Sequence, residues 1–406
     1  MQQITAPGTA SGTGPGRTGR PRGRWIWRLS GVVVVLAGTS LVAIALTKAG
    51  QPSYGDGFAV SALPTRTVTI PGTVTSVNVT SYGAPVQVTR GPVSEVSVVE
   101  TISFDKAQSV PAVTDAVSNG ALTLAAPSCA NAPCSVGFAV TVPDSVTVSA
   151  ASDGGPVSVS GAASADIDSA GGGVAASAIQ GLLTVTAAGG NVTVSGAGSA
   201  NLDSGGGSVS VNGVQGALNV STEGGSIDVH GTGDATLDSG GAPVNAAAVL
   251  GTLAVNSEGG SINVAGARGA TLDSGDGPVV ARGIDGPLSA DTQGGSLQVD
   301  GLTGPLTADT GDGPVNASGL ASATVKVSTE GGSAWLGFVS QPQSVQVTSN
   351  GGNAVLVLPG GPYAVSTQSF GGPVEVSVPV SAAATRTVSV STDGGELQVK
   401  SPAAGS

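Results

Sequence analysis

The sequence predicts an all-β fold: a single right-handed β-solenoid (β-helix) of about 17–20 residues per coil, preceded by one N-terminal transmembrane helix. Three observations lead to this prediction. A glycine turn followed by a short alternating strand recurs every 17 or 18 residues from Val157 to Val315. The chain holds 66 glycines but only 3% aromatic residues, a composition that suits short strands and tight turns. An apolar run of 18 residues, Leu29–Leu46, stands near the N-terminus. A short fixed period of this kind is the sequence signature of stacked coils.

The N-terminal part is predicted to attach the chain to a membrane. Residues 1–24 are rich in Gly, Thr, Ser, Pro and Arg and predict a disordered basic cytoplasmic tail. Residues 25–48 predict a transmembrane signal-anchor helix, because a span needs roughly 17–25 residues. Trp25 and Trp27 stand at its basic end, where interfacial aromatic residues are expected. Residues 49–64 are read as a linker.

The distribution of charge predicts the topology. Residues 1–48 carry six basic residues and no acidic one. The positive-inside rule therefore places the N-terminus in the cytoplasm and the body outside, as a single-pass protein of the cell membrane. A cleaved signal peptide is the alternative, because Ala43-Ile44-Ala45 offers a small-x-small site. Both interpretations place the body outside the cytoplasm.

The body is acidic, with 8 basic and 26 acidic residues after residue 48. Such a surface repels phosphate, so nucleic acid is excluded as a partner. The glycine turns contain no Gly-Lys pair entering a helix, which a phosphate-binding loop requires. No cofactor is expected.

The two cysteines, Cys129 and Cys134, favour a disulfide in an extracytoplasmic chain. The bond is expected to pin a hairpin between ALTLAA and VGFAVTV. Residues 65–150, which include this disulfide, alternate without a clean period and are expected to form irregular N-terminal β coils. Residues 151–400 are expected to form regular β-solenoid repeats, and 401–406 a disordered tail.

Within a repeat, one strand and a short crossing precede a second strand, and a glycine turn closes the coil. In Ser261–Val264, Ile262 and Val264 should point inward while the alternate residues point outward. Leu272 should join them from the second strand. The glycine pairs, such as Gly259-Gly260 and Gly294-Gly295, are expected to supply positive φ for tight reversals.

A column of polar residues precedes each glycine turn. These residues are expected to accept hydrogen bonds from turn amides. Acidic and neutral residues alternate along the column until Asp273, Asp291 and Asp309 fall on adjacent coils, with Asp276 and Asp312 nearby. This cluster has two interpretations: a weak calcium site, because oxygen ligands suit hard cations, or capping of turns on a solvated edge.

Aromatic residues appear where the coils lengthen after Val327: Trp335, Phe338, Tyr363 and Phe370. They have two interpretations as well. They could form a possible binding patch, or they could fill wider terminal coils.

The residues resemble a known family at this point. The segments VTVPDSVTVSAASDGGPVSVSG (140–161) and NGGNAVLVLPGGPYAVSTQSFGGPVEVSV (350–378), with the repeats between them, are similar to the "putative adhesin" family of bacterial surface proteins (the DUF4097 type). The resemblance covers residues 74–400 and implies a β-helix on a bacterial cell surface. It brings no catalytic residues with it.

We therefore expect a non-catalytic, adhesin-like protein that binds or displays at the cell envelope. Its ligand could be cell-wall polymer, a glycan or a surface protein. One alternative is a sensor or regulator of envelope stress acting through the membrane helix. The other is a polysaccharide-acting β-helix enzyme, which needs a carboxylate pair beside a basic residue. Arg268, Arg282 and Lys326 are isolated in the sequence, and His230 is expected to be solvated.

Overall fold

The structure, a computed structural model, describes residues 44–46, 60–105, 109–127 and 134–402. The chain divides into two compact units, Met1–Thr39 and Ser40–Ser406, and every described residue belongs to the second. The described residues form strands and no α-helix, so none of their segments is a helix able to span a membrane. The predicted tail (1–24) and residues 25–43 and 47–48 of the predicted membrane helix lie outside these ranges. The membrane helix therefore stays a prediction, and its residues Ile44–Leu46 form strand β1.

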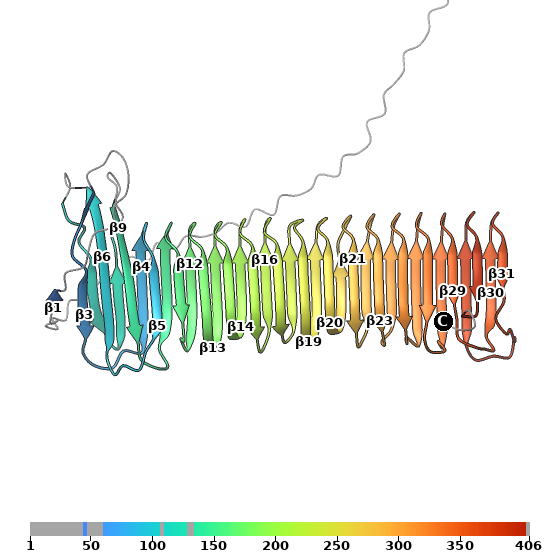
Figure 1. The fold of residues 1–406 in the computed structure, drawn as a ribbon, viewed down its shortest axis with the longest axis horizontal. Helices are drawn as coiled ribbons and strands as arrows, with labels where there is room; N and C mark the ends of the chain where they lie inside the picture. The colour runs from blue at the N-terminus through green and yellow to red at the C-terminus, as the bar shows by residue number, and fades with distance from the viewer. Residues whose placement is uncertain (1–43, 47–59, 106–108, 128–133, 403–406) are drawn as a thin grey trace, which may run out of the picture. The chain divides into compact units, whose positions relative to one another are not determined.

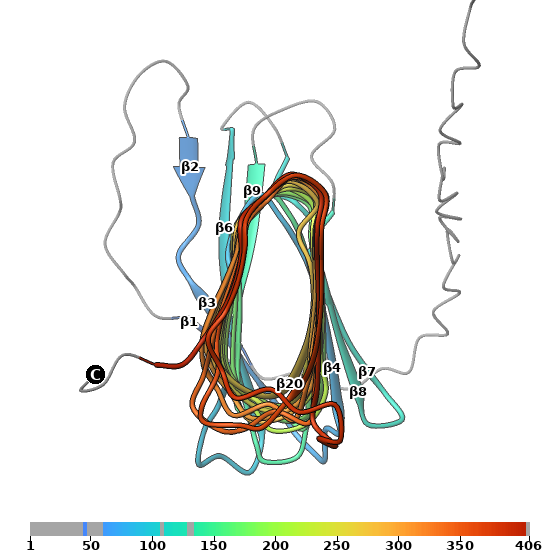
Figure 2. The ribbon, with the colours of Figure 1, turned by 90° about the vertical axis from the view of Figure 1, so that its right-hand side faces the viewer.

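Two parallel walls face each other across a thin apolar core (Figures 1 and 2). Each coil places one strand in each wall, and successive coils stack in register. Wall 1 consists of β4 (Ser76–Tyr82), β10 (Thr147–Asp153), β12 (Ser164–Ser169), β16 (Leu218–Thr222), β18 (Ala235–Ser239), β22 (Leu288–Thr292), β24 (Leu306–Thr310), β26 (Thr324–Thr329), β28 (Ser344–Ser349), β32 (Thr387–Thr392) and β30 (Ala364–Ser369).

Wall 2 runs alongside in the same manner. It consists of β5 (Val86–Arg90), β11 (Val157–Ser160), β15 (Val209–Val214), β17 (Ile227–Thr232), β21 (Val279–Ile284), β23 (Leu297–Leu302), β25 (Val315–Leu320), β27 (Ala334–Phe338), β29 (Ala354–Val357), β33 (Leu397–Lys400) and β31 (Val374–Val376). Four long strands cross from wall 2 to wall 1 and belong to both: β13 (Val174–Ala187), β14 (Val192–Ser204), β19 (Val244–Ser257) and β20 (Ile262–Asp273).

The core is the inward ladder that the alternation predicts. Ile262 aligns with Val244 on one neighbouring coil and with Val279 on the other, and all three are buried. Leu272 on wall 1 is buried between Val255 and Ala290 in the same way. One wall alone leaves its apolar face in water, whereas two stacked walls remove both faces from water. The predicted all-β solenoid is confirmed in the described residues.

The first part of the body adds a cap, built largely of antiparallel pairs, to the first coils. Its strands are β2 (Val60–Ala62), β3 (Arg66–Ile70), β6 (Val96–Asp105), β7 (Thr114–Ser118), β8 (Ala121–Ala125) and β9 (Cys134–Val142). β9 continues wall 2 beside β5, and β6 lies antiparallel to β9. β2 and β3 pair antiparallel with the two ends of β6, and β1 pairs with β3. β7 lies antiparallel to β8 at the edge of wall 1.

The predicted hairpin between ALTLAA and VGFAVTV is wrong. These segments are β8 and β9, and they lie in opposite walls: β8 pairs with β4 and β7, whereas β9 pairs with β5 and β6. Both segments alternate in the same way, so their pattern does not reveal that each finds partners far away in the sequence.

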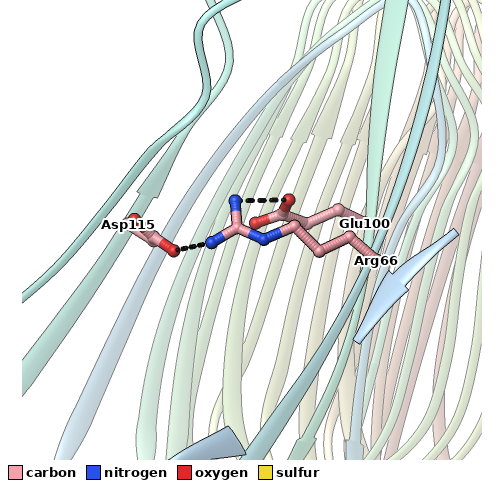
Figure 3. Close-up of polar contacts among 3 residues, drawn as sticks. All are labelled: Arg66, Glu100 and Asp115. Atoms are coloured by element: carbon pink, nitrogen blue, oxygen red, sulfur yellow. Dashed lines mark hydrogen bonds and ion pairs between the residues drawn. The ribbon is translucent and has the colours of Figure 1, made fainter. Parts of the chain in front are cut away.

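An ion cluster lies inside the cap (Figure 3). The guanidinium of Arg66 contacts Glu100 Oε2 at 3.4 Å and Asp115 Oδ2 at 2.9 Å. It thereby links β3 and β6, which extend wall 2, to β7, which extends wall 1. Glu100 is 1% exposed. Burial raises the pKa of Glu100, Arg66 opposes this rise, and Asp115 adds to it. Charged groups thus help to cover the end of the core nearest the N-terminus.

The opposite end has an unexpected order of coils. β32 pairs with β28 on one side and with β30 on the other, and β33 lies between β29 and β31 in the same way. The outermost coil, formed by β30 and β31, therefore comes earlier in the sequence than the coil of β32 and β33, which lies between it and the coil of β28 and β29. The described residues contribute no strand that covers the outer edges of β30 and β31. Val374 and Val376 of β31, which stand at inward positions, remain exposed.

The glycine pairs of the turns act mainly by close stacking. Of the pairs named above, only Gly259 has a positive φ, of 144°. A Cβ on Gly295 would stand 1.9 Å from the carbonyl oxygen of Gly277 on the preceding coil. Positive φ occurs at the crossings, as at Gly266 (79°) and Gly283 (61°), and also in some glycine turns, as at Gly241 (104°) and Gly275 (58°). The predicted positive φ is therefore found in part of the glycine turns.

Candidate functional site

The outer face of wall 1 presents a repeating array of polar side chains. Each coil contributes two outward residues, and neighbouring coils align them in columns: Thr184 and Thr186, Asn201 and Asp203, Asn219 and Ser221, Thr236 and Asp238. A shallow groove is lined by these side chains, and a second one, lined by Asn78, Ser149, Asp166 and Thr184, adjoins it. Asn219 Nδ2 donates to Asn201 Oδ1 at 2.9 Å, so the array is linked across coils.

The predicted column before the glycine turns exists. Asp273, Asp291 and Asp309 are exposed and stand on three successive coils in register. Asp276 and Asp312 lie in the turns themselves, where their Oδ1 atoms lie over Gly294 and Gly331 of the following coils. The five carboxylates therefore follow one edge of the solenoid over consecutive coils.

Repulsion within this column is visible at its middle member. Partial burial raises the pKa of Asp291, and the carboxylates of Asp273 and Asp309 raise it further. Among the described residues, no three His, Cys, Asp or Glu side chains are grouped so that they could hold a metal ion. The predicted calcium site therefore finds no support in this geometry.

The turns are capped mainly by the residue that follows the column. At most of these turns the next position is a buried Ser or Thr that donates its hydroxyl to the carbonyl three residues later, as Thr292 does to Gly295 at 2.6 Å. At one turn it is Ala187, which follows Thr186. The same bond recurs at Ser169, Ser204, Thr222, Ser239, Ser274, Thr310, Thr329, Ser349 and Thr392. Of the column itself, Asp273 accepts a turn amide, from Gly275 at 3.3 Å. This Ser/Thr periodicity is present in the sequence, interrupted at Ala187, and is the signal that predicts these caps.

A second missed residue is Asp234, at a crossing on the edge of wall 1. Its Oδ1 accepts from the amide of Thr252 at 2.8 Å and from the Thr252 hydroxyl at 2.9 Å. These two bonds from the next coil lower the pKa of Asp234, and Arg268 lowers it further. Asp234 therefore joins neighbouring coils and has no visible role toward a ligand.

The four aromatic residues do not form one patch. Phe338 and Tyr363 are 5% and 0% exposed and fill the core, and the Tyr363 hydroxyl donates to Pro359 O at 2.7 Å. Burial raises the pKa of Tyr363. Trp335 is 39% exposed on the outer face of wall 2, whereas Phe370 is 61% exposed beside a glycine turn after β30. Two members thus fill coils, as one interpretation held, and two stand apart on the surface.

The remaining candidates are separate from one another. Cys134 is disulfide-bonded, and its predicted partner Cys129 lies outside the described residues. His230 is exposed on wall 2. In the part of the chain that the structure describes, Arg268, Arg282 and Lys326 form no salt bridge.

Comparisons with known proteins add little to this geometry. No family model matches the sequence, and no curated protein matches it, so membership of the family it resembles stays a prediction. Solved structures do align with it. A putative adhesin from Bacteroides fragilis is 9% identical, with 84% of this chain and 97% of that chain covered and a TM-score of 0.20.

Two further structures align over a similar extent. A putative adhesin from Parabacteroides distasonis is 13% identical, covering 84% of this chain and 98% of its own, with a TM-score of 0.19. A putative cell adhesion protein from Clostridium sporogenes is 7% identical, covering 85% and 100%, with a TM-score of 0.15. Superpositions this poor establish neither the fold nor the activity of this chain.

Proposed function

We propose that this protein is a non-catalytic, adhesin-like scaffold that binds or displays at the cell envelope. A single-pass helix within residues 25–48, ending before strand β1, anchors it in the membrane, with the N-terminus in the cytoplasm and the β-solenoid outside. Its ligand is a component of the envelope or of a neighbouring surface, such as wall polymer, glycan or surface protein. The basic N-terminal residues and the two interfacial tryptophans support this orientation.

The outer face of wall 1 is the observation that supports binding. Its aligned Thr, Asn, Ser and Asp side chains offer many donors and acceptors on a rigid surface, so a ligand finds them already in place. Lys326 and Arg268 form no ion pair with a described carboxylate. An extended contact surface fits these features better than an acid–base pair does.

The test is co-sedimentation of the full-length protein, in detergent micelles, with purified cell wall, envelope glycan and outer-surface protein fractions. Retention on one fraction is expected. The wall 1 variant Asn201→Arg/Asn219→Arg should reduce retention, because two large side chains interrupt the array.

A matched control lies on the opposite wall. Asn263 Nδ2 donates to Asn245 Oδ1 at 3.2 Å on wall 2, so Asn245→Arg/Asn263→Arg makes the same change on the other face. Equal loss in both variants would show that wall 1 is not the contact surface. The proposal fails if no envelope fraction retains the wild-type protein. Release of new reducing or unsaturated ends from polysaccharide would instead favour an enzyme.

A further inference from the structure

We propose that the outer face of wall 2 around Trp335 binds an uncharged polysaccharide, with one sugar ring stacked on the indole. This inference deepens the proposed function, because it names a ligand class and a second contact surface. It rests on the proposal that the solenoid lies outside the cytoplasm, where such polymers occur.

The indole of Trp335 lies along the sheet. Trp335 occupies an outward position of β27 and is 39% exposed. A Cβ added to Gly337, the next outward residue of the strand, would stand 2.6 Å from Trp335 Cη2 and 2.9 Å from Cζ3. The six-membered ring therefore covers Gly337. Because glycine has no side chain, the ring can lie flat against the strand at that position. An aromatic ring held in this way loses little conformational freedom on binding.

The surroundings of the ring are uncharged. Trp335 aligns with Asn316 on one neighbouring coil and with Val355 on the other, and coils are about 4.8 Å apart. Asn316 is exposed, and its side-chain amide has no hydrogen bond to another described residue. The ring thus lies next to an amide that is free to donate and accept.

Charged side chains on this face begin two coils away on either side. They are Asp300 on β23 and, on the other side, Lys400 on β33 and Glu396 directly before β33. Asp300 Oδ1 already accepts a hydrogen bond from Ser318 Oγ at 3.0 Å, and Lys400 Nζ donates one to Gln398 Oε1 at 2.9 Å. A charged ligand therefore finds no oppositely charged partner beside Trp335, whereas an uncharged ligand needs none.

A pyranose ring suits this surface. Its C–H face is apolar and matches the exposed indole, while its hydroxyl groups can bond to the Asn316 amide. A cationic ligand could also stack on tryptophan, but β25 and β29, the adjoining strands of wall 2, carry no acidic side chain to add a second attraction. An extended polysaccharide can follow the flat face without needing a pocket.

The tryptophans make a direct binding assay possible. The chain has three: Trp25, Trp27 and Trp335. In full-length protein carrying Trp25→Phe and Trp27→Phe, in detergent micelles, all tryptophan emission comes from Trp335. Titration with β-1,4-linked N-acetylglucosamine hexamer and with a β-glucan hexamer should change this emission saturably for at least one of them. Polygalacturonate and polylysine should not change it.

Variants separate stacking from other effects. In pull-downs on insoluble chitin and β-glucan, Trp335→Ala should weaken binding about tenfold, Trp335→Phe less, and Asn316→Ala a few-fold. Phe370→Ala removes an exposed aromatic residue at another place and should bind as the wild type does. Circular dichroism and melting temperature verify that each variant is folded.

Three results would overturn the inference: no saturable emission change with either hexamer, unchanged binding by Trp335→Ala, or equal loss in Phe370→Ala. If Trp335→Ala binds both hexamers as well as the wild type does, and an envelope fraction still retains the protein, the scaffold proposal stands and the Trp335 site is wrong. If the hexamers bind but no envelope fraction retains the protein, the saccharide site stands and the scaffold proposal is wrong.

Discussion

At the scale of single residues, two neighbouring positions determine the end of each wall 1 strand. The outward position was recognised from the sequence as a column of acidic and neutral residues. The buried Ser or Thr beside it was not, although it caps nearly every glycine turn. Alternation predicts that this residue points inward, and a hydroxyl at an inward position normally counts against burial. It is tolerated here because the turn carbonyl accepts a hydrogen bond from the hydroxyl.

Removing repulsion in the column should stabilise the protein. Because the pKa of Asp291 is raised in the fold, the native state binds more protons than the unfolded state just above the usual pKa of 3.8. Stability therefore falls as pH rises through the window between 3.8 and the folded pKa. Asp291→Asn should raise the free energy of unfolding at pH 7 by about 0.5 kcal/mol, with no gain below this window. Denaturant melts at several pH values measure it.

The control for this prediction is Asp203→Asn. Asp203 aligns with Thr186 and Ser221, which are uncharged. Its substitution should give no comparable gain in the free energy of unfolding at pH 7. A gain for Asp291→Asn that persists in acid would show that repulsion is not the cause.

Removing a buried cap should destabilise the protein. Thr292→Val keeps the shape of the side chain but leaves the buried Gly295 carbonyl without its hydroxyl donor. The expected loss is about 1–3 kcal/mol in the free energy of unfolding, measured by urea denaturation. Thr307→Val on the outward side of neighbouring β24 makes the same chemical change in water and should cost much less. Equal losses would contradict the assigned role.

At the scale of elements, the glycine turns are fitted to each other from coil to coil. In most pairs the second glycine lies directly against the backbone of the neighbouring coil, and the first faces open space or a flexible side chain, whereas Gly240 and Gly241 show the reverse order. A pair that looks uniform in the sequence thus contains one constrained and one tolerant position. Only the stacking distance distinguishes them.

Alanine substitutions test this difference. In Gly295→Ala, the new Cβ would meet the Gly277 carbonyl oxygen at 1.9 Å, so neighbouring coils must separate. We expect a loss of about 3 kcal/mol or more. In Gly294→Ala, the nearest atom is Asp276 Oδ1 at 3.1 Å, at the end of a side chain that can move. A melting temperature close to wild type is expected for this variant, and a similar drop in both would refute the stacking explanation.

At the scale of the described solenoid, the two ends differ. Antiparallel strands and the Arg66 cluster cover the end nearest the N-terminus. The other end is the coil of β30 and β31, whose outer edges no described strand covers. Elements with few buried contacts and open hydrogen-bonding edges unfold locally at lower free energy.

Hydrogen exchange should show this asymmetry. Amides of β30 and β31 should exchange at least about tenfold faster than those of β28 and β32, although β32 comes later in the sequence. The inserted position of β32, between β28 and β30, is the reason. Exchange that instead increases steadily toward residue 400 would contradict the observed order of coils.

The sequence by itself determined the repeat, the inward and outward residues of each strand and the acidic column, because these depend on a local period that stacking merely copies. It could not determine which strands become neighbours outside that period. The separation of β8 and β9, the inserted last coil and the distinct places of Trp335 and Phe370 arise from contacts between residues distant in the chain. Local alternation is the same in all of these segments. Only the tertiary structure decides which of these strands become neighbours, because each strand at an edge pairs with the strand that continues its wall.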